Sequence, residues 1–456
     1  MIPASRSVGE RIEFGRGQRR KLRRSDHAHW DAKQRKHDPI EIILAVNRER
    51  IPALVPIKMA RMALSPFGFF RGNVPVMAAD FAAMRSTEIT VQICGDAHVH
   101  NLGAYAGPDG RLIFDINDFD ETIRAPWEWD LKRLGASLVL AGREAQNSDR
   151  LCRDAVLTCA EIYRTKMTEF SRMKYLEVAK YRIHRLFAGK PGTSVLQRAE
   201  RATPDHSLAK LTVARGKSRI FKEVKPILTH PPKSRARQVL QSLKDYRETL
   251  PTFSQHVLTF YRPVDVAFKI VGTGSVATHD YVVLHFAGDG ATDPLFLQVK
   301  ESVQSAYASY VKSPETKIHQ GERVVRAQRM LQVQSDILLG WTSLGGADYL
   351  VRQLNDHKAS IEDEDLKGQG LVEYATTCGE VLAKGHARSG DPAVLAGYLG
   401  MSDRCDKALA EFSVSYANQT SEDFESFKKA IRSGRINGKS VVVGESLTLG
   451  GDNNSE

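Results

Sequence analysis

The segment Cys94-Gly95-Asp96-Ala97-His98-Val99-His100-Asn101 places an aspartate five residues before an asparagine, and Ile116-Asn117-Asp118-Phe119-Asp120 follows it along the chain. The residues just before Gly95, Glu88 to Cys94, alternate apolar and polar as a half-buried strand does. Asp96 is therefore expected at a strand's end, where loops commonly carry functional groups. The turn signal Gly107-Pro108-Asp109-Gly110 lies between two short apolar runs. It predicts a β-hairpin that brings Asn101 beside a downstream aspartate.

This order of residues is typical of kinase-type phosphotransferases. In that chemistry Asp96 would be the catalytic base, which orients and deprotonates an attacking hydroxyl. Asn101 and the later aspartate would hold Mg²⁺ against the phosphates of ATP. Two oxygen ligands suffice, because phosphate and water fill the remaining positions. The D-x-x-x-x-N spacing alone also occurs in ordinary turns, so the prediction depends on the strand and hairpin around it.

Three aspartates compete for the second metal position. Asp115 lies 14 residues after Asn101 and Asp118 lies 17 after it, and the shorter spacing is closer to that of protein kinases. Lengthening both arms of the hairpin by two residues would keep facing residues in register. Asp118 also precedes Phe119, as in the kinase Asp-Phe-Gly sequence. We favour Asp118 and keep Asp115 and Asp120 as alternates.

A nucleotide-binding segment is expected much later in the chain. Gly272, Gly274 and Ser275 form a glycine-rich turn between two strand-like runs, and such a turn lets backbone N–H groups approach phosphate oxygens. Lys300 ends the next apolar strand, at a spacing close to that of the kinase lysine that contacts the α- and β-phosphates. A solvated lysine at a strand end would look the same in sequence. Glu322, in the first turn of a predicted helix, is the candidate ion-pair partner of Lys300; the alternative is an ordinary N-terminal helix charge.

Other candidates around the first segment each have a structural and a functional interpretation. Asp130 begins a helix 12 residues after Asp118. The order G-D-x-H-x-x-N, then D-F, then W-D-L resembles the aminoglycoside phosphotransferase and choline-kinase-like superfamily, and this resemblance implies that Asp130 braces the catalytic loop. It would also suit a helix N-terminus without that role. Arg71 would contact a phosphate or an acidic acceptor, or pair with a buried carboxylate. His98 would help to position the acceptor. Cys94 stands where those enzymes usually have histidine.

The order of these segments predicts an α+β, two-lobed, kinase-like fold that is circularly permuted, since the catalytic-loop segment precedes the nucleotide-lid strands. The large lobe is expected to be mostly helical. The predicted organisation is listed here: a basic N-terminal arm (1–40), a large-lobe part with the catalytic and metal loops and a helical insertion (41–260), a small β-rich nucleotide lobe (261–358), C-terminal large-lobe helices (359–440) and a disordered tail (441–456). Permutation is tolerable where chain ends lie close together at the surface.

The chain resembles the bacterial "domain of unknown function 2252" family over about residues 15–435. The segments that carry the resemblance are Ser65–Gly72, Gly95–His98, Asn117–Thr122, Val271–Ser275, Leu297–Glu301, Gln320–Val324 and His386–Gly390. The resemblance implies a kinase-like fold but no assigned reaction, so the acceptor substrate stays open.

Composition limits the function classes. The chain has 456 residues, 42% of them hydrophobic, and its five cysteines lack metal-site spacing. It contains neither a membrane-length apolar run nor a signal-peptide core, so we expect no membrane partner and a cytoplasmic location. The net charge is +11, and residues 1–36 hold 11 Lys or Arg against 4 Asp or Glu. This arm, which peaks at Arg19–Arg24, is either a solvated basic segment or a surface for nucleic acid.

The sequence thus supports a phosphotransferase that uses ATP and Mg²⁺ on a hydroxyl of an unknown small-molecule acceptor. Transfer of AMP and phosphorylation of a protein would use the same nucleotide site. A non-catalytic nucleotide-binding scaffold, or a nucleic-acid-associated protein that uses the basic arm, is the alternative from another class.

Overall fold

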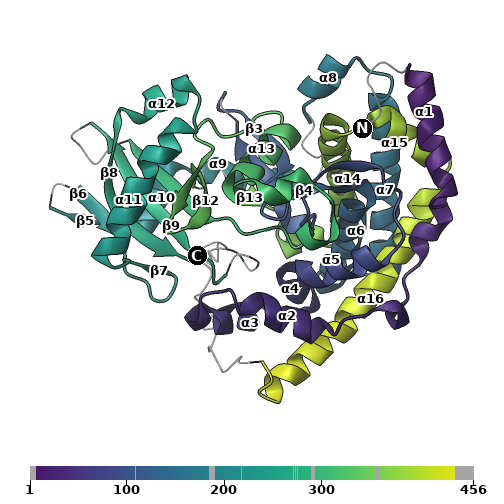
Figure 1. Cartoon of the computed structure of the whole chain (residues 1–456), viewed down its shortest axis with the longest axis horizontal. Helices are drawn as coiled ribbons and strands as arrows, with labels where there is room; N and C mark the ends of the chain where they lie inside the picture. Colours follow the sequence, from purple (N-terminus) through teal and green to yellow (C-terminus); the bar gives the residue numbers. More distant parts are fainter. Residues whose placement is uncertain are drawn as a thin grey trace.

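A computed structural model describes residues 7–107, 109–183, 190–216, 218–270, 272, 274, 276–288, 293–354 and 359–436. The fold is a mixed α+β arrangement of a sheet-rich part and a mainly helical part that lie side by side (Figure 1). The α+β class predicted from the sequence is therefore confirmed. The predicted tail (441–456) lies outside the described residues.

The sheet-rich part is built on a six-stranded antiparallel sheet with the order β11-β12-β10-β9-β8-β7. Its strands are β7 (Leu228–Thr229), β8 (Tyr261–Lys269), β9 (Asp280–Ala287), β10 (Pro294–Glu301), β11 (Gly340–Leu344) and β12 (Ala347–Gln353). The central strands β9 and β10 are apolar at almost every position, because both of their faces are covered. Tyr281, Val283 and Leu297 contribute to one buried cluster, whereas Val282 and Leu284 contribute to another.

Segments that precede β8 cover both faces of this sheet. They are α10 (Pro204–Leu211), β5 (Thr212–Arg215), β6 (Ser218–Phe221), α11 (Lys233–Glu248) and α12 (Thr252–Leu258). Helix α11 packs against β11 and β8, helix α10 contacts β10, and β7 pairs with β8. The structure therefore places residues 204–258 with the sheet, rather than with the helical part to which the predicted boundary at residue 260 assigned them.

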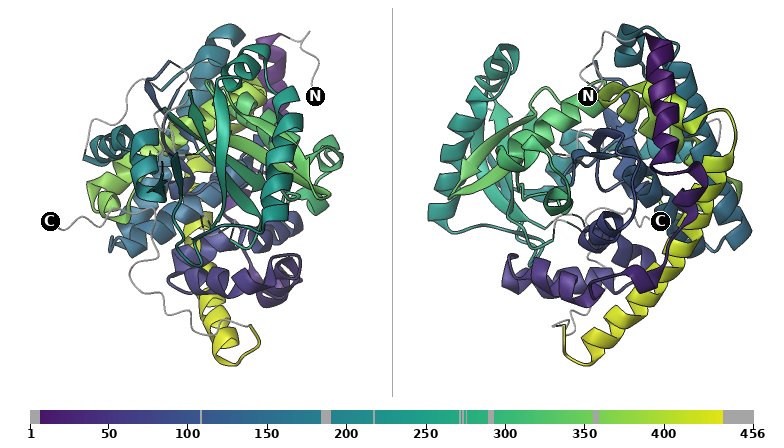
Figure 2. Two further views of the ribbon diagram at one scale, coloured as in Figure 1. Left: turned by 90° about the vertical axis from the view of Figure 1, so that its left-hand side faces the viewer. Right: turned by 45° about the vertical axis from the view of Figure 1, so that its right-hand side comes forward.

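The helical part contains most of the largest hydrophobic cluster. Its long helices are α6 (Trp127–Glu144), α7 (Asp149–Phe170), α14 (Gln369–Ser389) and α16 (Arg404–Arg432), with the shorter α8 (Tyr175–Lys180), α9 (Lys190–Arg201) and α15 (Pro392–Leu399) around them. Helices α6, α7 and α14 pack on one another, and α16 crosses α6 and α7 as the long C-terminal helix seen in Figure 2. Helix α13 (Gln320–Leu331) joins the two parts, since it contacts β11 and β12 on one side and α14 and β1 on the other.

Short strands of the helical part carry the segments singled out above. They are β1 (Thr90–Ile93), β2 (Leu102–Ala106), β3 (Leu112–Ile116), β4 (Ile123–Pro126) and β13 (Ala359–Ser360). The predicted hairpin is present: β2 pairs with β3 so that Leu102 faces Ile116. On the other edge β2 pairs with β13, the strand that follows the sheet-rich part in the chain.

The N-terminal segment winds around the helical part. It contains α1 (Val8–Gly17), α2 (Pro39–Asn47), α3 (Val55–Met62), α4 (Pro66–Gly72) and α5 (Val74–Ala83). Helix α1 packs along α15. Arg19 donates to the carbonyls of Gly397 and Tyr398, and Arg24 donates to that of Leu399, so both side chains cap the C-terminus of α15. Part of the basic arm thus has a structural partner.

Short 3₁₀ helices complete the described chain: η1 (Gln18–Arg20), η2 (Arg24–Ala28), η3 (Ala32–Gln34), η4 (Pro52–Leu54), η5 (Val99–Asn101), η6 (Ala308–Tyr310), η7 (Pro314–Lys317) and η8 (Asp363–Leu366). Within the described residues, no helix combines the length and the apolar character needed to cross a lipid bilayer.

Candidate active site

The buried carboxylate of Asp130 holds the loop that follows β1. Asp130, in the first turn of α6, accepts hydrogen bonds from the backbone N–H groups of Cys94 (2.7 Å) and Gly95 (2.9 Å). Gly95 has φ +81°, and a Cβ there would lie 2.2 Å from the carbonyl oxygen of Glu121, so only glycine fits. The hydroxyl of Tyr307 donates to the Gly95 carbonyl at 2.8 Å. These contacts fix the backbone immediately before Asp96.

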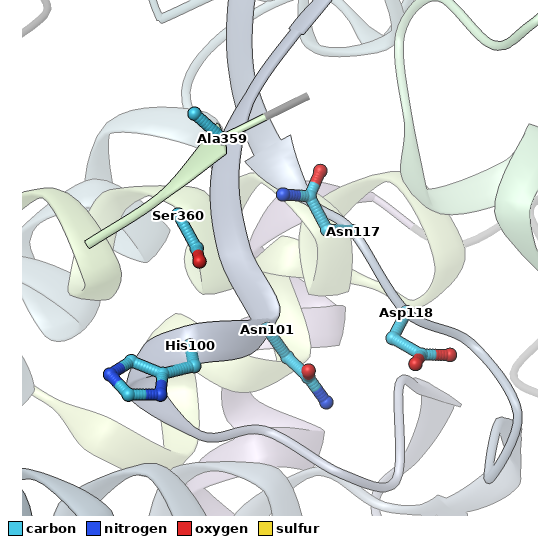
Figure 3. Close-up of a pocket in the computed structure, with 6 residues that line it drawn as sticks. All are labelled: His100, Asn101, Asn117, Asp118, Ala359 and Ser360. Atoms are coloured by element: carbon cyan, nitrogen blue, oxygen red, sulfur yellow. The ribbon is translucent and has the colours of Figure 1, made fainter. Parts of the chain in front are cut away.

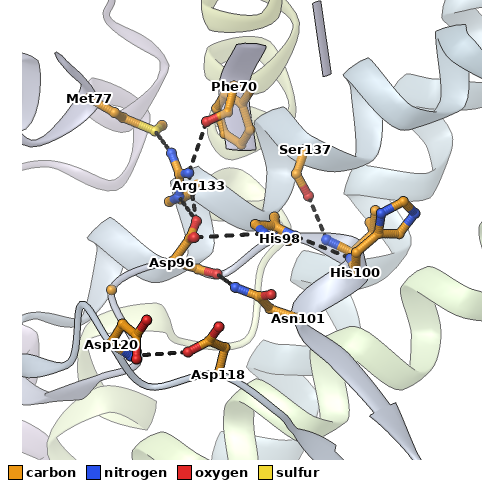
Figure 4. A network of polar contacts seen from close by, with 12 residues as sticks. Phe70, Met77, Asp96, His98, His100, Asn101, Asp118, Asp120, Arg133 and Ser137 are labelled. Carbon is orange, nitrogen blue, oxygen red and sulfur yellow. Dashed lines mark hydrogen bonds and ion pairs between the residues drawn. The ribbon is translucent and has the colours of Figure 1, made fainter. Parts of the chain in front are cut away.

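Asp96 is positioned by a buried arginine (Figure 4). Nε and Nη2 of Arg133, on α6, lie 2.7 and 2.6 Å from Oδ1 of Asp96. Burial raises the pKa of the Asp96 carboxyl, while the charge and hydrogen bond of Arg133 oppose that rise. Oδ1 is thus occupied by Arg133, whereas Oδ2 faces His98, whose Nε2 is 3.7 Å away.

Asn101 is tied to Asp96 through the backbone. Its Nδ2 donates to the Asp96 carbonyl at 2.9 Å, so its side-chain oxygen is the atom left to accept or to bind a cation. Its own carbonyl accepts from the N–H of Asn117 at 2.8 Å, as the last step of the β2–β3 hairpin. The hairpin therefore sets Asn101 next to the segment that begins at Asn117.

Lys300 reaches this same segment from β10. Its Nζ lies 2.6 Å from Oδ2 of Asp120 and 3.8 Å from Oδ2 of Asp118. The lysine side chain is 3% exposed, and both aspartate side chains are 30% exposed. Burial by itself would lower the pKa of Lys300, but the two carboxylates outweigh it and hold that pKa above its usual value. The two predicted segments, early and late in the chain, thus meet.

Asp115, the first alternate metal ligand, points elsewhere. It lies within β3 and forms an ion pair with Lys384 of α14, and both side chains are 1% exposed. Because a buried lysine already compensates this carboxylate, Asp115 does not share the position of Asp118 and Asp120.

Glu322 does not take the predicted role beside Lys300. It forms an ion pair with Arg326, one turn further along α13, while the ion pairs of Lys300 are with Asp118 and Asp120. The next residue, Arg323, is buried instead. It donates to the carbonyls of Asp120 (2.9 Å) and Thr122, so α13 supports the loop that carries Asp118 and Asp120.

Two hollows meet at Asn101 and Asp118. The smaller one is lined by His100, Asn101, Asn117, Asp118, Ala359 and Ser360 (Figure 3). The larger one encloses about 860 Å³ of space, its solvent-facing mouth included. That hollow is lined by Asp96, His98 and Arg71 and also by Gly272 and Gly274. Of the predicted site, only Ser275 lies outside the described residues.

His98 and Arg71, the two residues expected near the acceptor, both line the larger hollow, and burial lowers the pKa of each side chain. Burial keeps the pKa of His98 well below its usual value, so the imidazole is neutral. Its Nδ1 accepts from the N–H of His100, which leaves Nε2 toward Asp96. Arg71 comes from α4, and its Nε is buried with no hydrogen-bond partner among the described residues.

Asn101 and Asp118 suit a hard divalent cation. They offer one amide and one carboxylate oxygen at the junction of the two hollows. No group of three or more His, Cys, Asp or Glu side chains within the described ranges is arranged to hold a metal ion. These residues therefore fit Mg²⁺ only as part of a complex in which phosphate and water supply the other ligands.

Several supporting residues were not found from the sequence. Arg133 follows Asp130 by three positions, so both lie on one face of α6, and this helical spacing was the available signal. Arg323 and Lys58 carried no local signal, because their partners and surroundings come from distant segments. Lys58, on α3, lines the larger hollow and its side chain is 3% exposed.

Comparison with known families agrees with the resemblance noted in the sequence. A family model described as "Uncharacterized protein conserved in bacteria (DUF2252)" matches residues 50–430. Comparisons with curated proteins and with solved structures find no match. The matched range includes the Asp96 loop, the Asp118 segment, the glycine-rich turn and Lys300. The chain belongs to the bacterial DUF2252 family.

Proposed function

We propose that the protein is an ATP- and Mg²⁺-dependent phosphotransferase that acts on a hydroxyl group of a small acceptor. The observation that carries this proposal is the meeting of Lys300 with Asp118 and Asp120 beside Asn101 and Asp96. Phosphoryl transfer needs a phosphate-binding lysine, oxygen ligands for the metal and a base. Asp96, Asn101 and Asp118 line one hollow, and Lys300 lies directly behind it, paired with Asp118 and Asp120.

The order of elements in the sheet supports a kinase-like nucleotide lobe. Strands β8 and β9 flank the glycine-rich turn, β10 carries the lysine, and helix α13 follows before β11 and β12. Protein kinases have a glycine-rich loop, a lysine on the third strand and then a helix. One difference is that the first turn of α13 does not supply the partner of Lys300.

A contact between the two ends of the helical part supports circular permutation. Helix α14, late in the chain, ends near His386, whose Nε2 lies 3.2 Å from Oδ2 of Asp130. Asp130 in turn holds the loop of Asp96, early in the chain. In kinase-like phosphotransferases a helix that corresponds to α14 leads directly into the catalytic loop. A circular permutation would account for finding α14 late in the chain and the Asp96 loop early in it.

Each residue then has a defined task. Oδ2 of Asp96 would accept the proton of the acceptor hydroxyl, and Arg133 would keep the carboxylate ionised and in place. Lys300 would contact the nucleotide phosphates, and Gly272 and Gly274 would allow the backbone to approach them. Asn101 and Asp118 would hold Mg²⁺, which neutralises charge on the transferred phosphoryl group. Positioning and charge neutralisation would supply most of the rate enhancement.

The proposal is tested by nucleotide binding and product analysis. We expect Mg-ATP to bind the wild-type protein, and Lys300→Met to weaken that binding while the exposed Lys312→Met leaves it unchanged. With a pool of bacterial metabolites as acceptors, mass spectrometry should detect ADP and a product heavier by one phosphoryl group. Formation of AMP or pyrophosphate would instead indicate nucleotidyl transfer, and binding without turnover would indicate a scaffold.

A further inference from the structure

The larger hollow contains two cations that form no ion pair within the part of the chain that the structure describes, although Arg71 lies over the ring of Phe67. Lys58 and Arg71 line it from α3 and α4. Neither side chain forms a hydrogen bond or an ion pair with any residue in the described ranges, and Nε of Arg71 is fully enclosed. Keeping a cation out of water without a partner is unfavourable, so such a cation is most readily explained by a ligand that pairs with it.

The carboxylates of the same hollow form no ion pair with Lys58 or Arg71, because they have other partners. Asp96 pairs with Arg133, and Asp118 and Asp120 pair with Lys300. Glu301 accepts from both the backbone and the ring of His279. Glu121 accepts from the N–H of Ala306 at 2.6 Å. The acidic side chains are thus engaged, while Lys58 and Arg71 form no ion pair within the described residues.

These two cations share their hollow with Asp96, whose charge acts on Arg71, as well as with the glycine-rich turn. The smaller hollow is lined by Ala359 and Ser360, which follow the last strand of the sheet-rich part. The larger hollow shares Asn101 and Asp118 with it and is also lined by Asp96, Gly272 and Gly274. An acceptor hydroxyl has to reach Asp96, so Lys58 and Arg71 lie where the rest of the acceptor would be.

We propose that Lys58 and Arg71 form an oxyanion-binding subsite, so that the acceptor is a hydroxylated small molecule that also carries a phosphate or carboxylate group. This inference rests on the proposed phosphotransferase function. Arg71 would bind two oxygens of the anion through its planar fork, and Lys58 would supply a point charge. The pairing would anchor the acceptor at one end and leave its hydroxyl toward Asp96.

The experiment measures binding of matched probes by titration calorimetry with Mg²⁺ and a non-hydrolysable ATP analogue present. Glycerol 3-phosphate and glycerate carry the two anions, and glycerol lacks both. We expect at least one anionic probe to bind at least 10-fold more tightly than glycerol. Lys58→Met and Arg71→Met should each weaken that binding at least 10-fold. The exposed Arg48→Met, which makes the same charge change beside the hollow, should change it less than 2-fold.

A second measurement separates this inference from the proposed function. Affinity for the ATP analogue alone should stay within 2-fold of wild type in Lys58→Met, which removes an unpaired buried charge and should fold. If both variants lose nucleotide affinity in parallel with probe affinity, the two cations belong to the nucleotide site and the inference is wrong. Equal binding of glycerol and both anionic probes, with nucleotide binding intact, would also overturn it. Absence of nucleotide binding in the folded wild type would overturn the phosphotransferase proposal itself.

Discussion

Lys300 and Asp120 form an ion pair of 2.6 Å that joins β10, one of the two central strands of the six-stranded sheet, to the loop that follows the β2–β3 hairpin. The pair closes one cleft from two segments far apart in the chain. The proposed nucleotide site depends on this closure, so the first prediction concerns it.

Replacing Lys300 by methionine should remove the cation that we propose contacts phosphate, and it should leave the carboxylates of Asp118 and Asp120 without their shared partner. We expect the Kd for Mg-ATP to rise at least 10-fold. We also expect a loss of stability of about 1–3 kcal/mol, less than for a fully buried pair because Asp118 and Asp120 remain partly exposed. Calorimetric titration and urea unfolding measure the two effects, with Lys312→Met as the control. Unchanged nucleotide affinity would remove Lys300 from the site.

Asp130 is expected to act through the backbone of the Asp96 loop. Asp130→Ala leaves the N–H groups of Cys94 and Gly95 buried without acceptors, which should cost about 2–4 kcal/mol for the two groups. Turnover should fall more than nucleotide affinity, because the base is misplaced while Lys300 is unaffected. Steady-state kinetics and urea unfolding distinguish this result from a purely structural one, in which kcat per folded molecule would be unchanged.

Arg133 is expected to control the protonation of Asp96, the proposed base. Because its charge lowers the pKa of Asp96 against the effect of burial, Arg133→Met should raise that pKa further. A base must be deprotonated to act, so the acidic limb of the pH–kcat profile should move to higher pH by about one unit or more. Arg150→Met, which changes an exposed arginine with the same charge, should leave the profile in place. A uniform loss of kcat with no displacement of the limb would assign Arg133 to structure alone.

The free energy of unfolding is expected to depend on pH through the titration of Lys58. Burial lowers the pKa of Lys58 to about 7 from its ordinary value of 10.5, so between these two pH values the unfolded chain binds more protons than the folded one. Stability from this group therefore rises with pH across that window, and it is lowest below pH 7, where the buried amine is charged in both states. Lys58→Met should be more stable than wild type at pH 6 by about 1.4 kcal/mol or more, the equivalent of one pKa unit.

The difference between Lys58→Met and wild type should shrink as pH approaches 10. Urea unfolding at several pH values measures it, and Arg48→Met serves as the reference variant. A difference that stays constant with pH would show that Lys58 does not titrate in the folded protein.

The basic arm is expected to stabilise the fold. Arg19→Ala and Arg24→Ala each remove side chains that cap the end of α15, at a cost of about 0.5–1.5 kcal/mol per lost hydrogen bond. Thermal unfolding should detect this loss, and fluorescence polarisation with single-stranded DNA should show no difference between the variants and wild type. A salt-dependent loss of DNA affinity with unchanged stability would favour the nucleic-acid interpretation instead.

Sequence patterns within a short stretch of the chain were sufficient to predict the elements that form within that stretch. The alternation before Cys94, the turn at Gly107–Gly110 and the apolar runs of β9 and β10 each lie within one element, and the structure has those elements. The choice between Asp115 and Asp118 could not be made locally, because it depends on Lys384, which comes from α14. The same holds for Arg133 and Asp96, which meet only through packing of α6 under the loop.

Two features show what the sequence could not predict: the boundary near residue 260 and the partner of Lys300. Helix α11 has an ordinary amphipathic sequence, and nothing in it indicates that its apolar face packs on the sheet rather than on the other helices. Glu322 occupies the first turn of α13, as predicted, but helix rotation directs Arg323 rather than Glu322 toward the Asp120 loop. The hydrophobic periodicity of the sequence does not distinguish two orientations of α13 about its axis that differ by one residue position.

The most direct test of the central claim is titration of Mg-ATP into the wild type, Lys300→Met and Asp96→Asn, with folding verified for each. The account predicts binding to the wild type, at least 10-fold weaker binding to Lys300→Met, and nearly wild-type binding to Asp96→Asn together with loss of phosphoryl transfer. A folded wild-type protein that binds no nucleotide would contradict it.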